Sequence, residues 1–194
     1  MQNPHARTRT FMLNIDLNFI THLCLLLSLE NEGKRMSAKT VLSAISIEGI
    51  QVKNKEALEK LVIKEVEKIE SGLSIIGCQI PIDENMRVDI LCADYNGQIV
   101  VFKLSINEDD RMLFEGLQTL HQVNYVKRIL KFFNKNYKIN DKEHSRLILL
   151  APSFSDNLLT IAKGMTSVRI NLYEWEYLKF GDKKSLRLKP LSLT

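Results

Sequence analysis

Two predicted strands carry the charged side chains most able to do chemistry. Asp89 lies within the apolar strand at 87–93, and Lys103 lies within the apolar strand at 98–104, which an Asn-Gly turn joins to the first. An unpaired charge in an apolar strand destabilises the fold, so we predict that Lys103 forms an ion pair with Asp89, with Glu56 as a further acidic partner. The alternative is a metal site, because Mg²⁺ prefers carboxylate oxygens and Asp89 and Glu56 supply them.

The hydrophobic pattern predicts the helices and strands that position these groups. Apolar residues recur in steps of three and four between Asn54 and Gly72, which predicts a helix with those two residues as its caps. Further elements are predicted in the order strand 73–80, strand 87–93, strand 98–104, helix 109–133, strand 146–150, helix 155–163 and strand 168–173. This α-β-β-β-α-β-α-β order predicts an α/β fold with a mixed central sheet flanked by helices.

Six short motifs resemble, in their order, the nuclease domain of NucS-type endonucleases. They are EALE at 56–59, GLSIIGCQ at 72–79, RVDIL at 87–91, DYNGQIVV at 94–101, HQVNYV at 121–126 and LILLAP at 147–152. The chain is therefore similar to the PD-(D/E)XK, or restriction-endonuclease-like, superfamily, and closest to the C-terminal nuclease domain of NucS-type enzymes. In that superfamily acidic groups and a lysine converge on a divalent cation, which helps to hydrolyse the phosphodiester bond of DNA.

The positions that carry this chemistry depart from the motif. Lys103 stands where the resemblance places a metal-binding Glu, and Ser105 stands where it places the catalytic Lys. Glu56 and Asp89 match the motif. The four side chains together carry a charge of −1, whereas an intact set of Glu, Asp, Glu and Lys would carry −2. The resemblance therefore implies a degenerate site in which a fixed ammonium competes with a metal ion.

Two residues of the long helix belong to the same motif. Tyr125 matches it, and His121 stands where the resemblance places a Gln. The two residues lie one helical turn apart, so they either face the site as a pair or pack against the sheet. The relic catalytic positions implied by the resemblance are Glu56, Asp89, Lys103 and Tyr125.

A basic stretch runs from the long helix into the loop after it. It contains Lys127, Arg128, Lys131, Lys135 and Lys138. Such a stretch can bind phosphates, and the formal net charge of +4 permits contact with nucleic acid. We predict that Lys127, Arg128, Lys131 and Lys135 bind DNA; the alternative is an ordinary solvated helix face.

The chain is predicted to contain one main domain. An N-terminal apolar extension at 1–35 includes a helix at 11–29, which packs on the domain, on a protein partner or on a second copy of the chain. A connector at 36–52, a nuclease-fold domain at 53–180 and a basic tail at 181–194 follow. Met12 and Met36 are alternative starts. The apolar segment is too short and too interrupted to span a bilayer, so no membrane contact is predicted.

Three functions are consistent with these features. The first is a catalytically degenerate nuclease-fold protein that binds DNA or a protein partner and needs no cofactor. The second is an active DNA endonuclease that uses Mg²⁺ or Mn²⁺, bound by Asp89 and Glu56, in a rearranged site. The third is a structural or interaction module without a role on DNA. We favour the first, in the cytoplasm, because three scattered cysteines indicate a reducing compartment.

Overall fold

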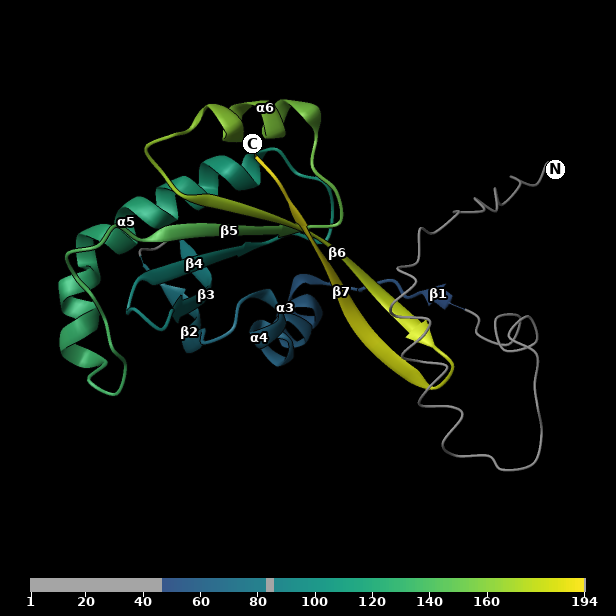
Figure 1. Ribbon diagram of the computed structural model, residues 1–194, viewed down its shortest axis with the longest axis horizontal. Coiled ribbons are helices and arrows are strands. Elements are labelled where there is room, and N and C mark those ends of the chain that lie inside the picture. The colour runs from purple at the N-terminus through teal and green to yellow at the C-terminus, as the bar shows by residue number, and fades with distance from the viewer. Residues whose placement is uncertain (1–46, 83–85, 194) are drawn as a thin grey trace. The chain divides into compact units, whose positions relative to one another are not determined.

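Residues 47–82 and 86–193 are described by a computed structural model (Figure 1). They form a mixed sheet with the strand order β1-β6-β5-β4-β3-β2, and β7 pairs with β6 outside this path. The apolar segment at 11–29, its predicted contact with a partner or second copy, and the alternative starts Met12 and Met36 lie outside the described residues.

From α3 to β6 the elements follow the predicted order, whereas β1, which lies in the predicted connector, and β7 were not predicted as strands. Their bounds are β1 (Ile47–Gly49), α3 (Lys55–Lys64), α4 (Val66–Ile69), β2 (Ser74–Pro81), β3 (Arg87–Ala93), β4 (Ile99–Leu104), α5 (Arg111–Phe133), β5 (Arg146–Ala151), α6 (Asp156–Gly164), β6 (Ile170–Phe180) and β7 (Lys183–Leu191). In this part of the chain no helix has the length and apolarity needed to cross a bilayer. The predicted α/β class with a mixed central sheet is confirmed.

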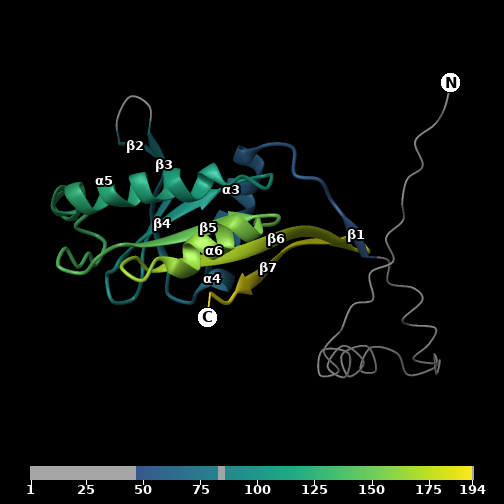
Figure 2. The same ribbon diagram turned by 90° about the horizontal axis from the view of Figure 1, so that it is seen from above.

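The sheet changes from antiparallel to parallel at β4. Strands β2, β3 and β4 pair as antiparallel hairpins, whereas β4, β5 and β6 run parallel, with α5 and α6 as the crossover helices. Helices α5 and α6 cover one face, and α3 and α4 cover the other (Figures 1 and 2). Strands β4 and β5 lie between these layers, so their side chains are buried on both faces.

Residues 183–191, predicted as part of a basic tail, form the strand β7. It pairs antiparallel with β6 along its whole length, and the two strands make a long ribbon (Figure 1). Leu186 is buried and Leu188 packs beside it, whereas Arg187 between them forms an ion pair with Glu176 of β6. The alternation of apolar and charged residues is that of a strand with one covered face.

Local sequence signals set the ends of several elements. The Asn54 side chain accepts a hydrogen bond from the backbone N–H of Ala57 at 2.9 Å and caps α3. The turn between β3 and β4 requires a glycine, because Gly97 has φ +87° and a Cβ there would lie 2.6 Å from the carbonyl oxygen of Lys138. The predicted single helix after Asn54 is interrupted at Glu65, where α3 ends and the short α4 begins.

A buried ion pair connects α4 to the centre of the sheet. Arg146, the first residue of β5, is fully buried, and its Nη2 lies 2.7 Å from Oε2 of Glu70 and 4.0 Å from Oδ2 of Asp94. Its Nε has no hydrogen-bond partner among the described residues. Glu70 is therefore the close counter-charge of a guanidinium that has no access to water.

We expect Glu70→Gln to lower the free energy of unfolding by about 2 kcal/mol, because it leaves a buried cation with only a distant carboxylate. Urea denaturation followed by circular dichroism measures the change. Glu67→Gln is the matched control, since Glu67 is an exposed acid on α4, the short helix that ends just before Glu70, and it should change the stability by less than about 0.5 kcal/mol. Equal stability of the two variants would contradict the role assigned to Glu70.

Candidate functional site

Asp89 is a buried carboxylate with both oxygens engaged. Only 3% of the residue is exposed. Its Oδ1 lies 2.7 Å from the Nζ of Lys55, and its Oδ2 accepts a hydrogen bond of 2.7 Å from the backbone N–H of Leu104. Backbone pairing between β3 and β4 ends at Ile90 and Phe102. Beyond that point the Asp89 carboxylate makes the next hydrogen bond between the two strands. The side chain therefore joins the two strands and one helix.

The helix residue that reaches Asp89 is Lys55 and not Glu56. Lys55 is the first residue of α3, and its side chain is 36% exposed. Glu56 is exposed and forms no ion pair or hydrogen bond within the described part of the chain. Successive helix residues are turned by roughly 100°, so positions 55 and 56 cannot both face Asp89. The structure therefore does not bring Glu56 to Asp89 or to Lys103, its predicted partner.

Lys103 pairs with a different acid. Its Nζ lies 2.7 Å from Oε2 of Glu115 on α5, and its side chain is 14% exposed. Lys103 shares the sheet face of Val101, which packs under α5, whereas Lys55 approaches Asp89 from α3 on the opposite side. The predicted ion pair between Lys103 and Asp89 is therefore wrong. Each of the two groups has a closer partner on the helix that covers it.

Ser105 is used to close the loop after β4. Its hydroxyl donates to the carbonyl of Asn107 at 2.6 Å and accepts from the N–H of Asn107 at 3.2 Å. Its carbonyl accepts a hydrogen bond of 2.9 Å from the indole Nε1 of Trp175. These contacts give Ser105 a structural role at the position where the resemblance places a catalytic lysine.

Tyr125 and His121 lie on the outer face of α5. Tyr125 is 83% exposed, and His121 is exposed as well. The buried residues of this helix, which include Leu120 and Val123, lie on the other side. The structure therefore does not bring Tyr125 and His121 to Asp89, and it does not pack Tyr125 against the sheet.

Burial disfavours the thiolate form of the two cysteines in the described ranges. Burial, with the nearby Glu59 carboxylate, raises the pKa of Cys78. Burial, and then the neighbouring Cys78, raise the pKa of Cys92 to about 12. A thiolate is the form that attacks or binds a metal, so neither side chain supplies one here.

The residues around Asp89 do not fit a divalent cation. Within the described ranges, no three His, Cys, Asp or Glu side chains converge as metal ligands. The ammonium of Lys55 and the N–H of Leu104 already occupy the two oxygens of Asp89. Mg²⁺ needs several oxygen ligands in an octahedral arrangement, and the neighbouring side chain that would complete the set is a cation.

The predicted DNA-binding residues lie together at the end of α5, and most have an internal contact. Lys127 donates to the carbonyl of Glu143 at 2.6 Å, and Lys131 lies 2.6 Å from Asp141. The hydrogen bond from Lys131 holds the pKa of Asp141 below its usual range. Arg128 is 87% exposed and 3.9 Å from Asp141, and the Lys135 Nζ lies 5.5 Å from the centre of the Phe132 ring.

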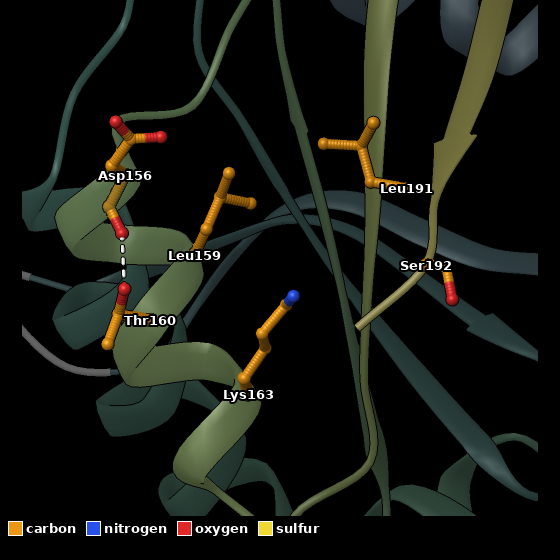
Figure 3. Close-up of a pocket in the computed structure, with 6 residues that line it drawn as sticks. All are labelled: Asp156, Leu159, Thr160, Lys163, Leu191 and Ser192. Atoms are coloured by element: carbon orange, nitrogen blue, oxygen red, sulfur yellow. Dashed lines mark hydrogen bonds between the residues drawn. The ribbon is translucent and has the colours of Figure 1, made fainter. Parts of the chain in front are cut away.

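A hollow lies elsewhere on the molecule, between α6 and the end of β7 (Figure 3). It is lined by Asp156, Leu159, Thr160, Lys163, Leu191 and Ser192. The hydroxyl of Thr160 is bonded to the carbonyl of Asp156 within the helix, at 2.8 Å. None of these residues belongs to the predicted site, and no sequence motif marks them.

The strand order and the helices on both faces define an α/β fold with a mixed central sheet. Three solved structures are similar. A repair endonuclease from Pyrococcus abyssi has 25% identity and a TM-score of 0.38, over 62% of this chain and 47% of that chain. EndoMS in a complex with dsDNA has 21% identity and a TM-score of 0.41, over 66% of this chain and 47% of that chain. Pyrococcus furiosus SfsA in complex with Ca²⁺ has 16% identity and a TM-score of 0.35, over 67% of this chain and 62% of that chain.

The similarity covers a part of those proteins. The chain spans less than two thirds of the length of each of the three. No protein-family model matches the chain, and no curated protein matches it.

We expect Lys55→Met to lower the free energy of unfolding by about 1–3 kcal/mol, because it removes the ammonium and leaves the Asp89 carboxylate buried without a cation. Lys60→Met removes an exposed ammonium from the same helix and should change the stability by less than about 0.5 kcal/mol. Thermal and urea denaturation measure the stability of both variants. A Lys55→Met protein as stable as the Lys60→Met protein would contradict the assigned ion pair.

Proposed function

We propose that this nuclease-fold domain does not cut DNA with a metal ion and acts by binding nucleic acid. The observation that carries the first part is the 2.7 Å contact between the Lys55 ammonium and Asp89. It puts a covalently attached cation against the carboxylate that the resemblance assigns to a metal.

Charge explains why the ammonium and a metal ion exclude each other. Two unit charges 4 Å apart interact by roughly 4 kcal/mol at an effective dielectric constant near 20, and a dication doubles that repulsion. Lys103 adds a second cation on the adjacent strand, which Glu115 neutralises. A metal at Asp89 would have to displace Lys55 and would find no second acid beside it.

Net charge supports the binding role. Residues 125–143 contain six lysines and arginines and two acids, a formal charge of +4 that equals the charge of the whole chain. The rest of the chain is neutral on the same count. A local excess of cations attracts a polyanion, and the phosphates of nucleic acid are the natural partner. A cytoplasmic location and a partner contact through residues 11–29 remain predictions.

The purified chain should not cleave plasmid or branched DNA in Mg²⁺ or Mn²⁺, and should not bind Mn²⁺ in a calorimetric titration. Lys55→Glu should bind Mn²⁺ at least about tenfold more tightly than the natural chain, because it replaces the cation at Asp89 with a second carboxylate.

Lys60→Glu makes the same charge change on the exposed side of α3 and should leave Mn²⁺ binding unchanged. Metal-dependent cleavage by the natural chain, abolished by Asp89→Ala, would overturn the proposal and establish an active endonuclease.

Binding to a fluorescent DNA duplex should weaken as salt rises. Replacing both Lys131 and Lys135 with Gln should lower the slope of log K against log salt by roughly 1.8, since each phosphate contact contributes about 0.9. Fluorescence anisotropy at several salt concentrations measures this slope. Lys60→Gln with Lys64→Gln removes two exposed cations from α3 and is the control. An equal effect of the two pairs would exclude residues 125–143 as the DNA surface.

A further inference from the structure

The hollow between α6 and the end of β7 has the size and the lining of a small-molecule site. We name it the α6 hollow, and its volume is about 360 Å³. Its lining residues are Asp156, Leu159, Thr160, Lys163, Leu191 and Ser192. The four that belong to α6 are spaced so that they share one face of the helix. Sites for small molecules in proteins have volumes of roughly 300–1,000 Å³, so a small ligand fits.

Opposite charges lie at the two ends of the α6 hollow. Asp156 is the first residue of α6, and Lys163 follows seven positions later, which is roughly 10.5 Å along the helix axis. Both residues are exposed, and within the described ranges neither side chain forms an ion pair or a hydrogen bond. The hydrogen bond between Asp156 and Thr160 uses the backbone carbonyl of Asp156, so the carboxylate stays available.

The middle of the α6 hollow is apolar. Leu159 and Leu191 are partly buried and pack against the core under α5 and α6. Figure 3 shows that Leu159 and Lys163 extend from the helix toward Leu191 on the other side of the gap. An apolar group between the two leucines would leave water, which favours binding.

This arrangement selects the charge of the ligand. An anion would be attracted by Lys163 and repelled by Asp156, and a cation would meet the reverse. A molecule that carries an ammonium at one end and a carboxylate at the other satisfies both residues. A polyanion such as nucleic acid has no group for Asp156.

The separation of the two charges selects the length of the ligand. A free amino acid carries both charged groups on one carbon, so it cannot reach both ends. An extended dipeptide spans roughly 7 Å, and an ion-pair contact of about 2.8 Å at each end brings the total close to the distance between Asp156 and Lys163. The side chains of a helix lean toward its N-terminus, which brings the Lys163 ammonium nearer to Asp156.

We infer that the α6 hollow binds a dipeptide-sized zwitterion with apolar side chains. Its ammonium contacts Asp156, its carboxylate contacts Lys163, and its side chains lie between Leu159 and Leu191. This site is separate from Asp89 and from residues 125–143, and it does not depend on the proposed nucleic-acid binding.

Titration of the ¹⁵N-labelled full chain with leucyl-leucine, up to about 20 mM, tests the site by NMR. The amide signals of Leu159 and Leu191 should shift, and free leucine should shift neither. N-acetyl-leucyl-leucine lacks the ammonium and leucyl-leucine amide lacks the carboxylate. Each should bind roughly threefold more weakly, because each loses one partly exposed ion pair. These four ligands test the natural chain, so this result does not depend on the stability of a variant.

Two variants assign the ends of the ligand. Lys163→Met should bind leucyl-leucine and its amide equally and should still discriminate against the N-acetyl compound. Asp156→Asn should show the opposite selectivity. Asn157→Ala is the matched control, since Asn157 is exposed on the same helix about 100° away from Asp156, and it should keep both preferences. The absence of shifts at Leu159 and Leu191, or both preferences retained in the two charge variants, overturns the inference.

Discussion

The Asp89 carboxylate lies between two strands, out of reach of water, and needs compensation there. The N–H of Leu104 and the ammonium of Lys55 satisfy one oxygen each. Because the ammonium comes from the first residue of α3, neutralising the charge also fixes where that helix begins on the sheet. A bound ion would leave the compensation dependent on ion concentration, whereas an attached ammonium makes it part of folding.

The same arrangement recurs at the other helices. Glu115 connects α5 to Lys103 of β4, and Glu70 after α4 connects to Arg146 of β5. Each contact joins one covering helix to one strand through a charged group that is largely buried on the strand side. Removing either partner leaves a largely buried charge without its counter-charge, which is strongly destabilising. These three ion pairs therefore add to the close apolar packing in holding each helix against its strand.

Local patterns in the sequence predict most of the fold, because caps, turns and apolar periodicity are local. The cap at Asn54 and the positive φ at Gly97 were readable in this way. The ion-pair partner of Asp89 was not readable, because Lys103 on the adjacent strand is the cation that the motif places nearest to it. Position 55 does carry a signal: Leu58 and Val62 face the core three and seven residues later, so Lys55 shares their face. The partner of Lys103 depends on how α5 crosses the sheet, which no local pattern contains.

Helix α5 shows the limit of periodicity most clearly. It has apolar residues on two opposite faces, and a repeat of three and four fits both, so the sequence alone does not say which face is buried. The sheet resolves this, because Leu120 and Val123 pack on it while Phe114 and Phe132 stay in water. A domain whose central carboxylate is neutralised by its own lysine has no charge left there to recruit an ion. Its remaining chemistry lies on its surface, where the excess of cations is concentrated in residues 125–143.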